Sequence, residues 1–347
     1  MVLQCGTSQA LFITSMELVK PQPTGFDLET VRSQLGGDWP EVNQQIIDCL
    51  QSDVALVNSV ARYIVNSGGK RLRPLLVLLA ARACGYEGDK HISAAVIIEF
   101  IHTATLLHDD VVDASDRRRG QETANSVFGN EASVLVGDFL YSRSFQLMVQ
   151  VGHMRIMDVL ADATNTIAEG EVLQLMNCNE PETTEQQYME VIYRKTAKLF
   201  EAGMLIGAIL ASQTRAIENA LTEYGRNLGC AFQLIDDALD YSANSDDLGK
   251  NIGDDLAEGK PTLPLIHALR NASADDQVVI RKAIINGGLE DIDRIAKTIH
   301  ETGALAYTVR RAEKAASEAI DALDALPDSR FKESLIGLAH FSAQRRY

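Results

Sequence analysis

The sequence predicts an all-α protein made of long helices. Proline breaks helix interiors, and only Pro181 interrupts the stretch between Pro74 and Pro261 in this chain of 347 residues. Within that stretch apolar residues recur at intervals of three and four, the spacing of an amphipathic helix, whereas the alternation typical of strands is scarce. Both patterns favour helices throughout, joined without an internal linker.

The N-terminus differs from the rest of the chain. Residues 1–24 are expected to be an unpacked, disordered extension that ends at Pro21 and Pro23. They do not resemble a signal peptide, because a basic start is missing and the apolar run ALFI is short. Whether translation starts at Met1 or at Met16 is open. We expect one domain from residue 25 to residue 347.

Three segments of this domain have the clearest helical spacing, and each justifies one long helix. They are AAVIIEFIHTATLLHDDVVD, ASVLVGDFLYSRSFQLMVQV and GRNLGCAFQLIDDALDY, which begin at residues 94, 132 and 225. The first and the third end in runs of aspartates. The sequence thus predicts two acidic helix ends in one bundle.

The composition excludes several kinds of protein. The net charge of −16 argues against a nucleic-acid partner, since phosphate backbones are bound by basic surfaces. No apolar stretch reaches the ~18 to 20 residues of a membrane-spanning helix. The five cysteines lie far apart and form no Cys-x-x-Cys pair. This pattern indicates reduced thiols in a cytoplasmic protein, without a disulfide framework or a zinc site.

Two aspartate motifs with the same spacing carry the chemistry. Asp109 and Asp113 lie one helical turn apart and face the same way, with their Cβ atoms about 6 Å apart. Asp236 and Asp240 repeat this arrangement. One such motif alone is often a solvated acidic face, but two copies after apolar helices indicate a shared cation. Carboxylates from two helices form an all-oxygen site, which selects Mg²⁺ or Mn²⁺ over zinc. Because magnesium readily shares its ligands with phosphate, we expect a polyphosphate substrate.

Basic residues cluster beside these motifs in an otherwise acidic chain, within GGKRLRP, DRRRG, RKTAKLF and LGKNIGDD. Guanidinium and ammonium groups bind phosphate oxygens, so the clusters fit a diphosphate. Ordinary ion pairing with the aspartates is the alternative. His102 and His108 lie in apolar helical sequence, where a core histidine with satisfied hydrogen bonds is the more common outcome.

These segments resemble a known family, the trans-isoprenyl diphosphate synthases. The match runs from GGKRLRPLL through FIHTATLLHDDVVDASDRRRG, GDFLYSRSFQLM, EGEVLQL and YRKTAKLF to AFQLIDDALDYSANSDDLGKNIGDDLAEGKPTLPLIHAL, and covers nearly everything after residue 25. The motifs are most similar to those of the bacterial long-chain branch. The resemblance implies a single-domain bundle of long helices around a central cavity, usually a homodimer. It also implies the addition of isopentenyl diphosphate to an allylic diphosphate such as farnesyl diphosphate, giving octaprenyl diphosphate for a quinone side chain.

Position by position, the resemblance also implies residue roles. Mg²⁺ would be bound by Asp109, Asp113 and Asp236, supported by Asp110, Asp237 and Asp240. The isopentenyl diphosphate site would consist of Lys70, Arg73, His102 and Arg119. The allylic diphosphate would be bound by Arg118, Lys195, Thr196, Gln233 and Lys250. No side chain needs to act as a nucleophile in this chemistry.

The length of the product depends on the tunnel below the first motif. Ala104 and Thr105 are small and leave room for a long chain. We expect the floor of the tunnel deeper in the bundle, at Phe145 or Met148. The exact chain length and the preferred primer stay open.

Three rival functions fit the sequence less well. Non-catalytic subunits of heteromeric prenyl synthases tend to lose aspartates, yet this chain keeps both motifs. A metal-dependent histidine-aspartate phosphohydrolase would need several histidine ligands, and the second motif contains none. A terpene cyclase would not need Lys70 and Arg73 for a second diphosphate.

Overall fold

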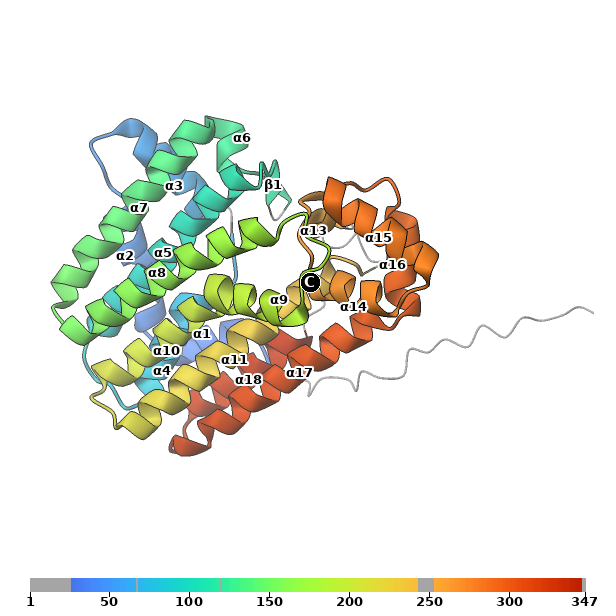
Figure 1. Ribbon diagram of the computed structural model, residues 1–347. Coiled ribbons are helices and arrows are strands. Elements are labelled where there is room, and N and C mark those ends of the chain that lie inside the picture. Colours follow the sequence, from blue (N-terminus) through green and yellow to red (C-terminus); the bar gives the residue numbers. More distant parts are fainter. Residues whose placement is uncertain (1–25, 67, 119, 243–252, 345–347) are drawn as a thin grey trace, which may run out of the picture.

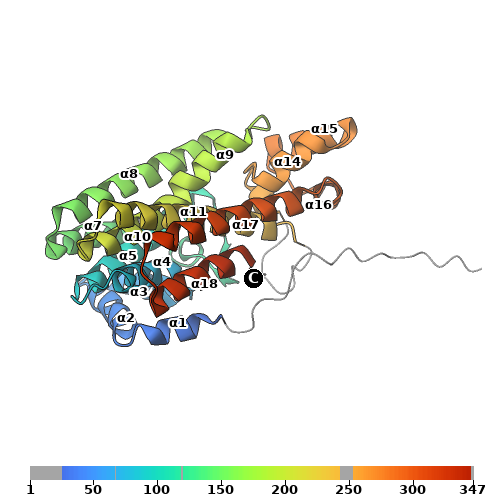
Figure 2. The same ribbon diagram turned by 90° about the horizontal axis from the view of Figure 1, so that it is seen from below.

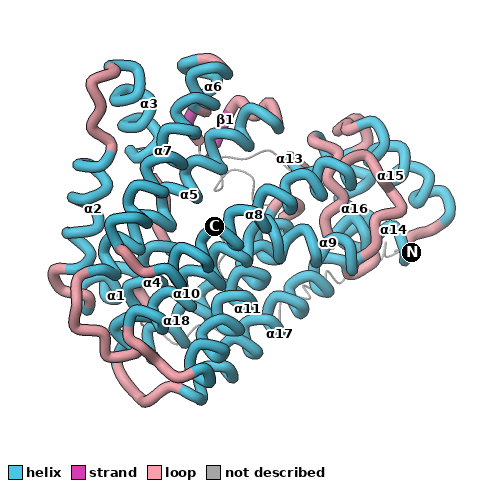
Figure 3. Tube along the Cα trace, turned by 60° about the vertical axis from the view of Figure 1, so that its left-hand side comes forward, coloured by secondary structure: helices cyan, strands magenta, loops and turns pink. Residues whose placement is uncertain are grey.

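The computed structural model describes residues 26–66, 68–118, 120–242 and 253–344. Most of these residues are helical, so the predicted all-α class is confirmed (Figure 3). The expected extension, residues 1–24, lies outside the described part of the chain. One element was not predicted: β1 (Arg117–Arg118) and β2 (Gln121–Glu122) form a short antiparallel hairpin directly after the first acidic motif.

The first half of the chain supplies the helices that lead to this motif and away from it. They are α1 (Leu28–Gln34), α2 (Asp38–Cys49), α3 (Ala55–Asn66), α4 (Leu72–Ala83), α5 (Lys90–Val112), α6 (Ala124–Phe128), α7 (Asn130–Val151) and α8 (Met154–Asn177).

The second half leads to the second motif and closes the bundle. Its elements are α9 (Glu185–Ile192), the π-helical turn η1 (Tyr193–Ala197), α10 (Lys198–Leu210), α11 (Arg215–Leu239), α13 (Asp254–Ala257), α14 (Leu263–Asn271), α15 (Ala274–Asn286), α16 (Ile292–Glu301), α17 (Ala304–Ala322), the 3₁₀ turn η2 (Leu323–Ala325) and α18 (Arg330–Gln344).

Long helices packed side by side make up most of the molecule (Figures 1 and 2). Helix α5 packs against α4, α7 and α10, and α11 packs against α10 and α17. The shorter helices α13 to α16 gather at one end of the bundle (Figure 1). The longest helices, α5, α7, α8 and α11, all lie in the stretch that contains almost no proline, as predicted.

Helix α5 is apolar nearly all the way round. By length and composition alone, Lys90–Val112 could cross a membrane, so the expectation that no apolar stretch is long enough needs correction. However, 67% of its apolar window is buried inside the protein. A helix that is hydrophobic on every face is typical of the centre of a large bundle, because all its faces are covered by other helices.

A buried charge cluster fastens α2 to the end of the bundle remote from the acidic motifs. Both Nε and Nη2 of Arg82 on α4 lie 2.7 Å from the carboxylate of Asp38 on α2. His91, which is 1% exposed, places its Nε2 atom 2.9 Å from the same carboxylate. Three elements are therefore joined through one aspartate.

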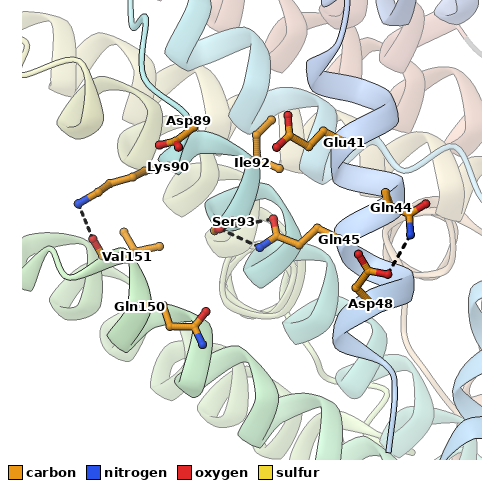
Figure 4. Close-up of a pocket in the computed structure, with 10 residues that line it drawn as sticks. All are labelled: Glu41, Gln44, Gln45, Asp48, Asp89, Lys90, Ile92, Ser93, Gln150 and Val151. Carbon is orange, nitrogen blue, oxygen red and sulfur yellow. Dashed lines mark hydrogen bonds between the residues drawn. The ribbon is translucent and has the colours of Figure 1, made fainter.

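Beside this cluster lies a polar groove of about 400 Å³ between α2, the start of α5 and the end of α7 (Figure 4). Lys90 spans part of it and donates to the carbonyl oxygen of Val151 over 2.8 Å. The groove is lined mainly by carboxyl and amide groups, which do not suit an apolar chain. It lies about 28 Å from Asp109 along α5, at 1.5 Å per residue, so it is separate from the site described next.

Candidate active site

Both aspartate motifs form the carboxyl ends of long helices. Asp113 caps α5, with its N–H 2.8 Å from the carbonyl oxygen of Asp109. Asp240 caps α11 in the same way, with its N–H 3.1 Å from the carbonyl oxygen of Asp236. The i, i+4 spacing predicted from the sequence is therefore present at both helix ends.

Lys195, on η1, faces the first motif from across the bundle. Its Nζ atom lies 2.6 Å from Oε2 of Glu171 and 2.7 Å from Oε1 of Gln174, both on α8. The same Nζ atom is 3.6 Å from Oδ2 of Asp109. An ammonium group thus lies between the first motif and a carboxylate on a neighbouring helix.

A second lysine pairs with the other end of this motif. Nζ of Lys260, just before α14, lies 2.7 Å from Oδ2 of Asp113 and 2.5 Å from Oε2 of Glu258. Burial alone would lower the pKa of Lys260, but the charges of Asp113 and Glu258 outweigh it and raise that pKa well above its usual range. The lysine therefore stays charged at the site.

The middle aspartate of the first motif points elsewhere. Asp110 is completely buried, and its Oδ1 atom lies 2.8 Å from Nε and 2.7 Å from Nη2 of Arg118 on β1. This two-point contact holds the hairpin against the end of α5. Arg118 is expected to bind the allylic diphosphate. Its ion pair with Asp110 places it beside the first motif.

The second motif has a buried hydrogen-bonded chain behind it. Asp237 accepts from the hydroxyl group of Tyr188 on α9 over 2.6 Å and from Nε2 of Gln233 over 2.7 Å. Oε1 of Gln233 accepts in turn from the hydroxyl group of Thr196 over 3.0 Å. Because Thr196 follows Lys195 directly, η1 contacts the first motif and is linked to the second through Gln233.

Burial opposes the ionisation of the carboxylates at this site. Burial raises the pKa of Asp109 despite the attraction of Lys195, and raises the pKa of Glu171 to about 7. Burial and the neighbouring charge of Asp255 raise the pKa of Asp237 to about 8. Burial is the largest cause of each shift, so these carboxylates are poorly solvated, and a cation bound among them would stabilise their ionised form.

The chemistry of the donor set fits a hard divalent cation. Asp109 and Asp113 keep 14% and 18% of their side-chain surface exposed, and Asp236 is likewise incompletely buried. All three offer only oxygen atoms. Within the described ranges, no three His, Cys, Asp or Glu side chains converge closely enough to hold an ion by themselves. A cation here would therefore need ligands from water or from a substrate, as Mg²⁺ typically does.

The residues expected to bind isopentenyl diphosphate meet where α4 begins. Nη1 of Arg73 lies 2.9 Å from Nε2 of His102 on α5, and its guanidinium group stacks 4.6 Å from the ring centre of Phe200 on α10. Lys70 lies 5.3 Å from the ring centre of Phe341 on α18. His102 therefore pairs with Arg73, a contact that its apolar sequence context did not reveal. Two expected diphosphate ligands, Arg119 and Lys250, lie outside the described residues.

His108 and the expected tunnel residues occupy different environments. His108 contacts α7, with Nε2 3.1 Å from the carbonyl oxygen of Val134, which fits its interpretation as a structural histidine. Thr105 is half-buried, one turn before Asp109, while Ala104 is fully buried. Of the two expected floor residues, Met148 is 1% exposed and Phe145 is 42% exposed. Met148 is therefore the better candidate for a closed end.

Several residues of the site were not singled out from the sequence, among them Glu171, Gln174, Lys260 and Tyr188. Glu171 and Gln174 lie in EGEVLQL, and Lys260 follows the second motif in GKP, so each belongs to a segment that had already attracted notice. Their contacts depend on how α8 and the start of α14 pack. Tyr188 carries no sequence signal, because its role comes only from the position of α9 over Asp237.

Comparison with known proteins gives a consistent result. The profile of the family described as polyprenyl synthetase matches residues 54–302. The chain is 54% identical to the octaprenyl diphosphate synthases of Haemophilus influenzae and Escherichia coli, over 92% of this chain and 98% and 99% of theirs. A polyprenyl synthase from Caulobacter crescentus, crystallised with calcium and isoprenyl diphosphate, superposes with a TM-score of 0.90 at 43% identity. The match covers 94% of this chain and all of that one.

Proposed function

The chain belongs to the polyprenyl synthetase family, and from this we propose that it is a long-chain trans-polyprenyl diphosphate synthase. It is a prenyltransferase that adds isopentenyl diphosphate units to an allylic diphosphate and releases pyrophosphate. The observation that carries the proposal is η1, which places Lys195 beside the first aspartate motif and links Thr196 to the second. The chemistry needs both motifs around one diphosphate.

A divalent cation is part of this proposal, and we assign it as Mg²⁺ held by Asp109, Asp113 and Asp236. When bound, it would neutralise the diphosphate and make pyrophosphate a better leaving group. The lysines of the site act in the same direction: Lys195 and Lys260 stay charged, and stabilise the negative charge that develops as the allylic carbon–oxygen bond breaks.

The double bond of isopentenyl diphosphate then attacks the allylic cation, and a proton is lost to the departing pyrophosphate. In this proposal Lys70, Arg73 and His102 hold the diphosphate of the attacking substrate, so that its double bond faces the cation. The surrounding bundle must exclude water, which would otherwise capture the cation. The apolar α5, buried along most of its length, forms one wall.

We propose octaprenyl diphosphate, destined for a quinone side chain, as the product and farnesyl diphosphate as the primer. The relatives at 54% identity that carry the octaprenyl name support this product length. We also propose a cytoplasmic location, which is supported by the free cysteines Cys49, Cys84, Cys178 and Cys230.

A second copy of the chain completes the proposal. Leu135 and Val149 on α7 are both 67% exposed, and they lie fourteen residues apart, about four helical turns, on the same face. Phe145 lies on that face as well. Large exposed apolar side chains gathered on one helix face are typical of an interface, and most soluble oligomers are symmetric homodimers.

The test is to incubate the purified protein with farnesyl diphosphate and labelled isopentenyl diphosphate, with and without Mg²⁺, and to separate the dephosphorylated products by chromatography. Products of about eight isoprene units that require Mg²⁺ would support the proposal. Release of inorganic phosphate without chain growth would favour a phosphohydrolase. No reaction until a second protein is added would favour a subunit of a heteromeric enzyme.

A further inference from the structure

The turn that carries Lys195 and Thr196 is π-helical and lies between α8 and α11 (Figure 1). The N–H of Lys198 bonds to the carbonyl oxygen of Tyr193, five residues back. Such turns are rare and frequently occur at functional sites. Here two residues adjacent in sequence act on different helices, since Lys195 contacts α8 and the end of α5 while Thr196 contacts α11.

Two glycines, one on each flanking helix, touch the backbone of this turn. A Cβ atom added to Gly170 of α8 would lie 2.8 Å from the backbone nitrogen of Lys195. One added to Gly229 of α11 would lie 2.5 Å from Cα of Ala197. These distances are about 0.6 Å and about 0.9 Å short of the 3.4 Å at which ordinary contact begins. Any side chain at either position must displace the turn or its own helix.

Ion pairs to α8 hold both ends of the same turn. Arg194 places Nη1 2.6 Å from Oε2 of Glu169. Lys198, the first residue after the turn, places Nζ 2.9 Å from Oδ2 of Asp162. The two carboxylates are seven residues apart on α8, which puts them on the same face, about two helical turns apart. The two ion pairs therefore restrain sliding of the turn along α8, and the close contact at Gly170 sets its distance from that helix.

We propose that Gly170 and Gly229 are positioning residues, which set the place of the π-helical turn so that Lys195 and Thr196 reach the two aspartate motifs together. The inference rests on the proposed function. Neither glycine touches substrate; each acts through the backbone of the turn. The geometry of a catalytic group must hold within less than an ångström, because a 1 Å misplacement can cost about a hundredfold in rate.

The test substitutes Gly170→Ala and Gly229→Ala separately and measures steady-state kinetics with both substrates. We expect kcat to fall at least tenfold in each variant, while the KM for isopentenyl diphosphate changes less than about twofold. The reason is that Lys70 lies in the loop before α4, Arg73 on α4 and His102 on α5, so none of them belongs to the turn. Arg73 is linked to the turn through Phe200, three residues beyond its end, so we expect a small effect on this KM rather than none. Circular dichroism and thermal melts establish that each variant is folded.

Gly207 on α10 supplies the matched control. A Cβ atom added there would lie 2.5 Å from Cβ of Ala80 and 2.7 Å from the backbone nitrogen of Ala81, so the packing defect is as severe. However, Gly207 lies about 18 Å along the chain axis from Lys195, at 1.5 Å per helical residue. Gly207→Ala should lower the melting temperature while kcat stays within about threefold of wild type.

A milder variant keeps the proposal testable if neither alanine variant folds. The double substitution Glu169→Gln and Asp162→Asn removes the two anchors on α8, whose side chains are 56% and 66% exposed. It should lower kcat several-fold without changing the KM for isopentenyl diphosphate. Unchanged kcat in this variant would overturn the proposal, and so would glycine variants that fold and behave like Gly207→Ala. A wild-type protein that forms no prenyl chain would instead refute the proposed function.

Discussion

At the level of single residues, Asp109 and Asp113 each face an ammonium group. Asp109 lies 3.6 Å from Lys195, and Asp113 lies 2.7 Å from Lys260. Both carboxylates of this motif therefore already have a positively charged neighbour. Such pairing lowers the cost of burying charge.

Removing one carboxylate should disable this arrangement. We expect Asp109→Ala and Asp236→Ala to lower kcat by on the order of 10² to 10³ or more, because the charge on pyrophosphate would lose part of its stabilisation. The measurement is the initial rate of chain growth at saturating Mg²⁺. Asp138→Asn, at a side chain that is 62% exposed on α7, is the control and should keep full activity. Near-normal rates in either motif variant would show that the site does not use both helices.

The two diphosphate sites should separate kinetically. Arg73→Ala removes a charge-assisted contact worth roughly 1.5 to 3 kcal/mol, and should raise the KM for isopentenyl diphosphate about ten- to hundredfold. Lys195→Ala should chiefly impair use of the allylic substrate. Steady-state kinetics with each substrate varied in turn provides the comparison. The same defect towards both substrates in both variants would contradict the assignment of separate sites.

Whether a contact of the site could be predicted depends on how far apart its two residues lie in the sequence. Helix spacing alone placed Asp109 with Asp113 and Asp236 with Asp240, because neighbours four residues apart share a face. The partner of Lys195 could not be predicted in this way: Glu171 lies 24 residues upstream, on a helix whose packing the local sequence does not determine. The same holds for Lys260, which pairs with a residue 147 positions away.

At the level of elements, the scarcity of proline correctly predicted where the long helices lie, but local irregularities were missed. Proline acts through the backbone of its own turn, so its effect can be judged from the sequence. The hairpin at Arg117 depends instead on the ion pair of Arg118 with the buried Asp110. The π-helical turn depends on close backbone contact with Gly170 and Gly229. The hairpin and the π-helical turn are each stabilised by contacts with other elements, so the local sequence alone does not predict them.

The end of α5 should set the length of the product. Thr105 lies one turn before Asp109 and is half-buried, so Thr105→Phe would place a ring just below the first motif. We expect products several isoprene units shorter, with a nearly normal rate for the first condensation. Ala104→Phe should act similarly, with an added cost in stability because Ala104 is fully buried. Met148→Ala should allow longer products. Chromatography of dephosphorylated products measures all three, and unchanged lengths would mean that the chain does not pass these residues.

The charge cluster at the other end of α5 should make stability depend on pH. Burial opposes the charge of Asp38, but hydrogen bonds from Arg82 and His91 outweigh it and lower the pKa of this carboxyl below its usual value of 3.8. A lowered pKa in the folded state means that the stabilisation is complete above about pH 4 and is lost as the pH falls through the folded value.

Asp38→Asn should therefore lower the melting temperature at pH 7, because Arg82 loses its charged partner. The difference from wild type should shrink as the pH falls below about 4 and disappear below the lowered pKa of the folded carboxyl, where the wild-type carboxyl is protonated as well. Thermal melts from pH 3 to pH 7 test this. Asp328→Asn is the control, at a side chain that is fully exposed, and its melting temperature should follow wild type at every pH. An equal difference between Asp38→Asn and wild type across the whole range would contradict the mechanism.

At the level of the whole molecule, the outer face of α7 is a part of the structure that a monomer does not explain. Its inner face packs against α5, so the helix has an established place in the bundle. Its outer face nevertheless exposes Leu135, Phe145 and Val149 to solvent in a single chain. A surface helix normally presents polar residues there. In an isologous contact, α7 of one copy would face α7 of the other across a two-fold axis. These exposed apolar residues would then be buried in both copies.

Charges placed on this face should separate the copies. Leu135→Glu combined with Val149→Glu puts four carboxylates into the proposed interface, where each would be desolvated without a partner. We expect light scattering coupled to size-exclusion chromatography to show a dimer for wild type and a monomer for the double variant. Val278→Glu is the control, because Val278 on α15 is similarly exposed, at 66%, but lies in a different part of the molecule. It should remain dimeric. A wild-type monomer, or a double variant that stays dimeric, would place the interface elsewhere. We further expect the monomeric variant, if folded, to extend prenyl chains, because every site residue described above comes from one chain.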